Sequence, residues 1–167
     1  GAAPTSDHDS VVLVPNSRQA LARVASNFYG NPSARMHLIG ITGTNGKTTA
    51  TYLLESIFKK AGYGVGVIGT INYRYGQKVV PALNTTPESL DLQGILREML
   101  GEGISHVIME VSSHGLDLDR VFGCQFDGAV FTNFTLEHLD YHKTLERYFE
   151  SKRKLFSEFL MKSLKPR

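Results

Sequence analysis

The stretch "GITGTNGKTTATYLL", residues 40–54, constrains the fold more than any other part of the sequence. Before it, Met36–Ile41 is an apolar run typical of a strand, and after it Lys47–Ala61 has the apolar spacing of a helix that Gly62 ends. A glycine-rich turn between a strand and a helix allows backbone N–H groups to converge on phosphate oxygens. Its lysine would meet the β/γ-phosphates and its hydroxyl would bind Mg²⁺. The stretch therefore predicts a phosphate-binding loop.

This loop departs from the strict P-loop pattern. The pattern has a glycine five positions before Gly46, where this chain has Ile41, and the nearest glycines are Gly40 and Gly43. An ordinary glycine-containing turn is the alternative, but the strand before and the helix after favour phosphate binding. The residues predicted to contact a nucleotide are Gly43, Thr44, Asn45, Gly46, Lys47, Thr48 and Thr49.

Strand-like and helix-like patterns alternate along the rest of the chain. The expected strands are Val65–Ile71, His106–Val111 and Gly128–Phe131, and the expected helices are Ser17–Tyr29, Glu88–Leu100 and Thr144–Leu160. Val11–Val14 is a further short apolar run, and Tyr73–Val80 suggests an irregular excursion. The alternation predicts an α/β fold, a doubly wound and mostly parallel sheet flanked by helices. A strand would come after the last helix, so we expect the domain to be incomplete.

A second glycine pattern is a decoy. Gly64, Gly66 and Gly69 in "GVGVIG" match the dinucleotide-binding spacing G-x-G-x-x-G. That motif follows a strand and opens a helix, whereas this one follows a helix and lies within a strand pattern. We interpret these glycines as close packing of a buried strand.

Composition narrows the function classes. A length of 167 residues suits one ordinary domain, and a net charge of +2 gives no reason to expect nucleic acid or a membrane surface as a partner. No apolar stretch is long enough to span a bilayer, and the first ten residues lack the hydrophobic core of a signal peptide. A single cysteine, Cys124, excludes an internal disulfide and favours a reducing compartment.

The stretch "HVIMEVSSHGLDLDRV", residues 106–121, places a carboxylate at the end of an expected strand. Ligands of open α/β sheets bind at that edge, so Glu110 could hold Mg²⁺ near the phosphate loop. The alternative is a solvated acid at the strand end. Ser112 and Ser113 follow and could simply cap a helix. Arg120 could bind a phosphate or a carboxylate, or could be exposed.

The stretch "FTNFTLEHLDYH", residues 131–142, again follows an expected strand. Glu137, His138, Asp140 and His142 are crowded into it without a cysteine, which argues against structural zinc. Oxygen ligands with one histidine are compatible with Mg²⁺ or Mn²⁺. Taken alone, the pattern is equally typical of a solvated acidic loop.

Lys152 is the most unusual residue of the last expected helix. It falls on an apolar stripe made by Leu145, Tyr148, Phe149, Leu155, Phe156 and Phe159. Burial of an ammonium group is costly and lowers its pKa, and a neutral amine can react with CO₂ to form an anionic carbamate that binds metal. On periodicity alone the favoured alternative is that the stem packs while the charge reaches water.

Five strings together carry a family resemblance. "GITGTNGKTT" resembles the nucleotide loop of the Mur ligases, although folylpolyglutamate and cyanophycin synthetases share that loop. "VIGTINY", "NTTPES", "MEVSSHGL" and "FTNFTLEHLDYH", in this order, resemble the branch that adds a diamino acid to UDP-N-acetylmuramoyl-L-Ala-D-Glu. The resemblance covers about residues 11–160.

The resemblance implies roles that the residues alone do not. It makes Lys152 the carbamylated, metal-bridging lysine, which reverses the preference stated above. It implies catalytic roles for Lys47, Glu110, His138 and Lys152, and Mg²⁺ ligation by Thr48, Glu110, His138 and Lys152. It assigns Thr85, Thr86, Ser112 and Arg120 to the muramoyl-peptide substrate. Leu118 departs from the pattern, because the family has a polar residue shortly before the arginine.

The resemblance also implies a domain plan and a reaction. Residues 1–33 would be a linker or the end of a preceding domain, and residues 34–167 would be an incomplete central ATP-binding domain. The implied activity is ATP-dependent amide formation through an acyl phosphate, by a monomer in the cytoplasm or in the plastid stroma of a photosynthetic eukaryote. The partners would be UDP-N-acetylmuramoyl-dipeptide and a diamino acid, either L-lysine or meso-diaminopimelate. A cyanophycin-type ligase and a non-catalytic scaffold are the alternatives.

Overall fold

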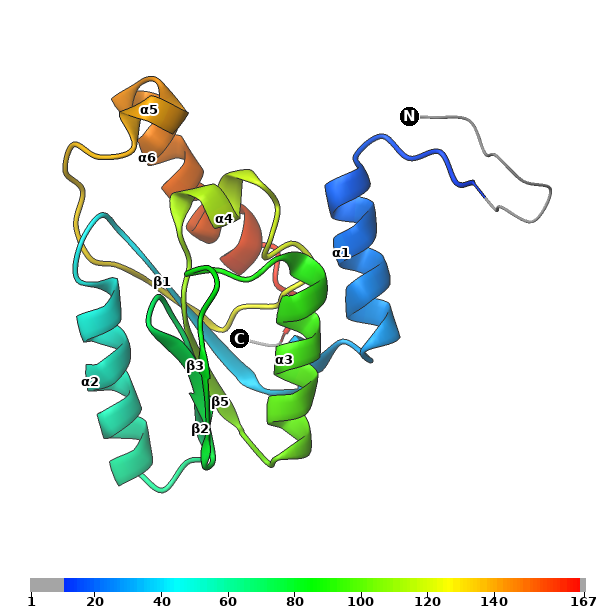
Figure 1. The fold of residues 1–167 in the computed structure, drawn as a ribbon, viewed down its shortest axis with the longest axis vertical. Helices are drawn as coiled ribbons and strands as arrows, with labels where there is room; N and C mark the ends of the chain where they lie inside the picture. Colours follow the sequence, from blue (N-terminus) through cyan, green and yellow to red (C-terminus); the bar gives the residue numbers. More distant parts are fainter. Residues whose placement is uncertain (1–10, 166–167) are drawn as a thin grey trace.

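The computed structural model describes residues 11–165 as a six-stranded sheet with helices on both faces (Figure 1). The first ten residues, which lack a signal-peptide pattern, and the last two lie outside the described range. The strands are β1 (His37–Thr42), β2 (Val65–Ile68), β3 (Asn72–Tyr75), β4 (Lys78–Pro81), β5 (His106–Glu110) and β6 (Gly128–Phe131). The helices are α1 (Ser17–Phe28), η1 (Pro32–Arg35), α2 (Lys47–Lys60), α3 (Ser89–Gly101), α4 (Ser113–Asp117), α5 (Leu139–His142), α6 (Leu145–Lys154) and η2 (Leu155–Leu160).

The strand order is β4-β3-β2-β5-β1-β6, and β2, β5, β1 and β6 run parallel. The expected α/β class with a mostly parallel sheet is therefore confirmed. Strand β1 lies between β5 and β6, with Ile41 opposite both Glu110 and Val130. This register brings the loops after all three strands to one edge of the sheet, where open α/β sheets bind their ligands.

Two expectations between β2 and α3 were wrong. Strand β2 ends at Ile68 rather than Ile71, because the chain turns at Gly69, whose N–H donates to the carbonyl oxygen of Asn72 at 3.2 Å. The segment 73–80 is no irregular excursion, since β3 and β4 form an antiparallel hairpin that extends the sheet beside β2. Its residues alternate in burial along β3, a period-2 pattern too short to recognise among polar neighbours.

Helix α2 covers one face of the sheet. Ala50, Leu54 and Phe58 pack on Ile41, Val65 and Ile108 of the strands. Leu53 is 61% exposed and Ile57 is exposed as well, so not every apolar side chain of the helix faces the sheet. Gly46 begins the helix and Gly62, with a φ of 86°, follows its last turn, as the sequence predicted.

The opposite face carries the larger core. Leu92, Leu96 and Met99 of α3 pack there on the strands, and α1 packs outside α3 (Figure 1). A Cβ added to Gly66 in β2 would lie 2.7 Å from the Sδ atom of Met99. This close approach confirms strand packing for Gly66, whereas Gly64 and Gly69 lie just outside β2.

The expected last helix is two elements. Thr144 caps α6, since its Oγ1 accepts the N–H of Arg147 at 3.2 Å, and the chain continues from Leu155 as a π-helix to Leu160. At the other end, Val11–Val14 forms no strand and is exposed. Within residues 11–165, no helix has the length and apolar character needed to cross a membrane.

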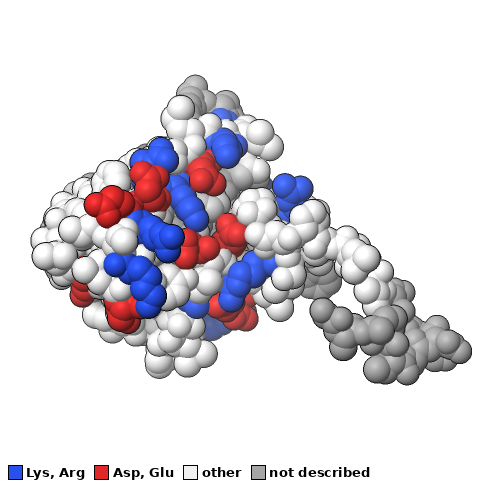
Figure 2. Space-filling model, turned by 90° about the horizontal axis from the view of Figure 1, so that it is seen from above, with Lys and Arg blue, Asp and Glu red and all other residues white. Residues whose placement is uncertain are grey.

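Figure 2 shows one face of the molecule, on which Lys and Arg side chains lie interspersed with Asp and Glu side chains. Mixed signs at this spacing largely cancel at a distance, so this face presents no single-sign field of the kind that attracts a polyanion.

Candidate active site

The nucleotide loop has a backbone that requires glycine at two positions. Gly43 has a φ of 140° and Gly46 a φ of 81°, and both values lie in the range that side chains disfavour. A Cβ on Gly43 would also collide with the Oγ1 atom of Thr132. Loop geometry and close packing therefore both select glycine at position 43.

Residues after β6 hold this loop in place. The N–H of Thr44 donates to the carbonyl oxygen of Asn133 at 2.9 Å, and the N–H of Asn45 donates to the Oδ1 atom of Asn133 at 2.9 Å. The hydroxyl of Thr132 donates to the carbonyl oxygen of Asn45 at 2.6 Å. The hydroxyl of Thr44 is buried and accepts the N–H of Thr135. The N–H groups of Thr44 and Asn45 thus donate to acceptors within the protein.

The start of α2 provides the donors that remain. The first N–H groups of a helix have no carbonyl partner within it and carry a partial positive charge. Here that start comprises Lys47, Thr48 and Thr49, directly after Gly46. The Nζ atom of Lys47 lies over the loop, 2.9 Å from the carbonyl oxygen of Gly43 and 2.8 Å from that of Thr44. Orphan N–H groups and an ammonium group around one loop fit a polyphosphate.

Glu110 lies beside this helix start and is buried, with 1% of its surface exposed. Its Oε1 atom accepts the hydroxyl of Thr48 at 2.9 Å and the N–H of Thr70 at 3.2 Å, and its Oε2 atom accepts the hydroxyl of Thr70 at 2.9 Å. A Cβ on Gly69 would lie 2.5 Å from Oε1. The alternative of a solvated strand-end acid is therefore wrong. A hydroxyl and a carboxylate at this separation are hard oxygen donors of the kind that Mg²⁺ prefers.

The predicted substrate residues gather on the same edge. The hydroxyl of Thr86 donates to the carbonyl oxygen of Glu110 at 3.1 Å and accepts the N–H of Ser112 at 2.9 Å. The Nη1 atom of Arg120 donates to the carbonyl oxygen of Thr86 at 3.0 Å. Ser112 also caps α4, because its hydroxyl accepts the N–H of Gly115 at 3.0 Å. Its capping and pocket positions are thus compatible.

An open pocket of about 340 Å³ joins the phosphate loop to these residues. Lys47, Thr85, Ser112 and Arg120 all line it. The remaining lining residues are Thr70, Asn84, His114 and His138. A ligand in this pocket would contact the phosphate-side ammonium group and the guanidinium group at once.

Lys152 contacts the loop and is buried, with 1% of its surface exposed. Its Nζ atom donates to the carbonyl oxygen of Gly43 at 2.8 Å and lies 4.4 Å from the centre of the Tyr148 ring. Burial, with Lys47 as a second cause, lowers the pKa of Lys152 to about 7. The alternative in which its charge reaches water is therefore wrong. An amine with this pKa is substantially neutral at physiological pH, which is the form that reacts with CO₂.

His138 belongs to an aromatic group that includes Tyr148, whose ring lies beside the Lys152 amine. It has a φ of 56°, its ring lies 5.8 Å from that of Tyr148 and 5.2 Å from that of His114, and its Nε2 atom lies 3.8 Å from Glu137. Among residues 11–165, no three His, Cys, Asp or Glu side chains lie close enough to hold a metal ion together. Metal binding here would thus need the Thr48 hydroxyl, a modified lysine or oxygens of a ligand.

Several residues around this site were missed from the sequence. Thr70, which binds both oxygens of Glu110, follows the shortened β2, and Thr132 and Asn133 directly follow β6. Each of them comes just after a strand, so the rule that ligands bind at the carboxyl edge of the sheet could have marked them. Glu88, which contacts Arg120, was missed as well, but it precedes a helix and carries no such signal.

A strand, a glycine loop and a helix on a mostly parallel sheet, with a buried acid beside the helix start, define a P-loop-type α/β domain. The chain belongs to the Mur ligase family, since residues 41–164 match the model of the Mur ligase middle domain.

Two curated relatives show the similarity. Over 147 residues the chain is 55% identical to a UDP-N-acetylmuramoyl-L-alanyl-D-glutamate--2,6-diaminopimelate ligase of Geobacter metallireducens, covering 88% of this chain and 29% of that protein. Over 155 residues it is 53% identical to the ligase of the same name from Geobacillus thermodenitrificans, covering 93% and 32%. The chain thus spans about a third or less of these relatives' length.

Two solved structures are similar to this chain as well. A UDP-N-acetylmuramoyl-L-alanyl-D-glutamate--2,6-diaminopimelate ligase superposes with a TM-score of 0.75 and 33% identity, over 89% of this chain and 30% of that one. E. coli FolC in complex with DHPP and ADP superposes with a TM-score of 0.66 over 89% of this chain and 41% of that one. At 24% identity, the second match supports the fold alone.

Proposed function

We propose that this chain is the central part of an ATP-dependent ligase that joins a diamino acid to UDP-N-acetylmuramoyl-L-Ala-D-Glu in peptidoglycan precursor synthesis. The observation that supports this most is the pocket that Lys47 shares with Thr85, Ser112 and Arg120. A lysine suited to phosphate in one pocket with groups suited to an anionic substrate supports phosphoryl transfer to a carboxylate. The names of the relatives favour 2,6-diaminopimelate as the diamino acid, with L-lysine as the alternative.

The chain's own residues would have the following roles. Lys47 and the N–H groups at the start of α2 orient the γ-phosphate and neutralise its charge. Thr85, Thr86, Ser112 and Arg120 hold the muramoyl-peptide so that its carboxylate oxygen faces that phosphate in line. The acyl phosphate formed on the substrate is then attacked by the amine of the diamino acid, and phosphate leaves. No side chain of the protein needs to act as a nucleophile.

We assign Mg²⁺ to two places. Thr48 and Glu110 would hold one ion on the phosphate side, and His138 with carbamylated Lys152 would hold another on the carboxylate side. Bound Mg²⁺ supplies neutralisation of the charge that develops on phosphate and carboxylate oxygens. The buried amine of Lys152, with its lowered pKa, supports the carbamate.

Further parts of the proposal concern context. We propose that residues 1–33 connect to a preceding domain and that residues 34–167 are part of the central one, with α1 packed on it. The protein acts as a monomer without nucleic acid or membrane insertion. The reaction belongs in the cytoplasm, or in a plastid stroma, because ATP is supplied there. Because the chain spans about a third or less of its relatives' length, we propose that the chain alone binds nucleotide without forming an amide.

The test is ADP release by the longer protein that contains this chain. We expect release to require UDP-N-acetylmuramoyl-L-Ala-D-Glu and a diamino acid together, with 2,6-diaminopimelate far more effective than L-lysine. Release that depends on another acid acceptor, such as an aspartate–arginine polymer, would support the cyanophycin-type alternative. No ATP turnover with any acceptor would support a non-catalytic scaffold. The intact set of Lys47, Glu110, His138 and Lys152 favours catalysis over a scaffold.

A further inference from the structure

The start of α1 is fastened to the loop that carries Arg120. The side chains of Asn16 and Gln19 both donate to the Oδ2 atom of Asp119, at 3.2 Å and 3.1 Å. Asp119 has a φ of 54°, a conformation that needs support from its surroundings. The Nη1 atom of Arg18 donates to the carbonyl oxygen of Leu118 at 3.1 Å. Helix α1 therefore contacts the two residues directly before Arg120.

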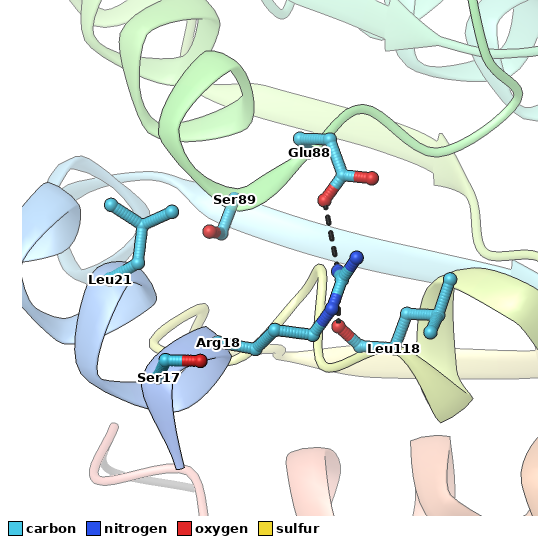
Figure 3. Close-up of a pocket in the computed structure, with 6 residues that line it drawn as sticks. All are labelled: Ser17, Arg18, Leu21, Glu88, Ser89 and Leu118. Carbon is cyan, nitrogen blue, oxygen red and sulfur yellow. Dashed lines mark hydrogen bonds and ion pairs between the residues drawn. The ribbon is translucent and has the colours of Figure 1, made fainter. Parts of the chain in front are cut away.

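Glu88 lies between two arginines that come from different parts of the fold. Its Oε2 atom lies 3.2 Å from the Nη1 atom of Arg18, and its Oε1 atom lies 2.9 Å from the Nη2 atom of Arg120. Figure 3 shows Arg18 extending from α1 between Glu88, at the start of α3, and the carbonyl oxygen of Leu118. The Glu88 carboxylate thus contacts both Arg18 of α1 and Arg120, which lines the pocket.

Both terminal nitrogens of the Arg120 guanidinium group have partners. Nη1 donates to the carbonyl oxygen of Thr86, Nη2 contacts Glu88, and the buried Nε atom has no hydrogen-bond partner among the described residues. Two anchors on different nitrogens fix the plane of the group. Since 15% of the Arg120 side chain is exposed, against 48% for Arg18, Arg120 is the more enclosed of the two.

We propose that Glu88 is a positioning residue that orients Arg120 toward the muramoyl-peptide substrate. Arg18 of α1 shares the carboxylate and thereby weakens the attraction of Glu88 for Arg120. The inference rests on the proposed function. A carboxylate alone on Arg120 would compete with an anionic substrate for the guanidinium group. Sharing it with Arg18 weakens that competition while both anchors keep the plane fixed.

A purely structural ion pair would behave differently. Exposed pairs contribute little to stability, and 42% of the Glu88 side chain is exposed. Loss of Glu88 should therefore change folding little. The effect should fall on the binding of one substrate, because Glu88 contacts Arg120, which lines the pocket.

The experiment compares Glu88→Ala and Glu88→Gln in the longer protein by steady-state kinetics. We expect Glu88→Ala to raise the KM for UDP-N-acetylmuramoyl-L-Ala-D-Glu about ten-fold, with kcat and the KM for ATP within about two-fold. Glu88→Gln retains an amide oxygen that can accept from Arg120, so its KM should return most of the way to the wild-type value. Calorimetric titration with the same nucleotide substrate should show the same order of Kd values.

Glu98→Ala is the matched control, since Glu98 is an exposed acid of the same helix that pairs with Lys78. It should leave every kinetic constant unchanged. An unchanged KM in Glu88→Ala, or a Glu88→Gln variant as impaired as Glu88→Ala, would overturn the positioning role. So would equal losses for both substrates together with a lower Tm. If the wild-type protein does not respond to UDP-N-acetylmuramoyl-L-Ala-D-Glu, the proposed function fails, and the inference fails with it for that separate reason.

Discussion

Lys47 and Lys152, far apart in the sequence, both donate to the carbonyl oxygen of Gly43, at 2.9 Å and 2.8 Å. Two amino groups on one oxygen repel each other when both are charged, and their burial adds to that cost. Burial lowers the pKa of Lys47, although Glu110 and Glu137 act in the opposite direction. The pKa of Lys152 falls to about 7 because of burial first and Lys47 second. The pair therefore favours a charged Lys47 beside a neutral Lys152.

The first prediction concerns Lys47. Lys47→Ala should weaken ATP binding by about ten- to a hundred-fold, because a charge-assisted hydrogen bond to phosphate is lost. Isothermal titration calorimetry on the chain measures this directly. Lys60→Ala, at the other end of α2, is the control and should bind ATP as the wild type does. Equal ATP affinities in Lys47→Ala and the wild type would remove the phosphate role of Lys47.

The second prediction concerns Lys152 in the longer protein. Lys152→Ala should nearly abolish amide formation, and a short carboxylic acid in the buffer should partly restore it by occupying the vacated ligand position. Lys152→Arg should not respond to the acid, because the guanidinium group fills the space with the wrong charge. Lys154→Ala, two positions along α6, controls for general damage to the helix. Full activity of Lys152→Ala without added acid contradicts the carbamate assignment.

The third prediction separates charge from packing at Glu110. Glu110→Gln keeps an amide oxygen that can accept from Thr48 or Thr70, so the chain should unfold near the wild-type temperature. Glu110→Ala removes a buried, charged acceptor of the hydrogen bonds from Thr48 and Thr70, and should lose about 1–3 kcal/mol of stability. Both variants should lower turnover of the longer protein by orders of magnitude if the carboxylate binds Mg²⁺. A Glu110→Gln protein that is only a few-fold slower at saturating Mg²⁺ would refute the metal role.

The fourth prediction is a pH dependence away from the active site. Burial acts to raise the pKa of Glu55, but hydrogen bonds from Arg74 and Lys59 outweigh it, so the pKa lies below its usual value of 4.5. Arg74 contacts it through two nitrogens, at 2.9 Å and 2.6 Å, and thereby ties β3 to α2. A lowered carboxyl pKa means that the unfolded chain binds the proton more readily. The stabilisation is present above pH 4.5 and is lost as pH falls through the lower, folded-state pKa.

Denaturant unfolding of Glu55→Gln tests this. At pH 7 the variant should be less stable than the wild type by about 2 kcal/mol, since a charged hydrogen-bond acceptor is lost. The difference should shrink toward zero once the pH falls below the folded-state pKa of Glu55, where both side chains are neutral. Glu102→Gln, at an exposed acid directly after α3 on the opposite face of the sheet, is the control. A gap for Glu55→Gln that stays constant from pH 7 to 3 contradicts the assigned shift.

The sequence predicted the elements whose signals are local. The helix from Lys47 was found because glycines bracket it, and the strand ending at Glu110 because it is an uninterrupted apolar run. The same reasoning failed for the hairpin of β3 and β4, whose strands are only four residues long. Short strands at the edge of a sheet depend on pairing with a neighbour rather than on their own sequence.

For the candidate site, the sequence by itself determined which chemical groups exist and that Glu110 and the loop fall at strand ends. It could not decide between a buried and a solvated Lys152, because helical periodicity gives a face but not what covers that face. Only the tertiary structure placed Gly43 against Lys152 and buried Glu110 between Thr48 and Thr70. These contacts join residues far apart in the chain, and their burial sets the pKa of Lys152. Burial is a property of the packed sheet and helices together, which is why no local pattern encodes it.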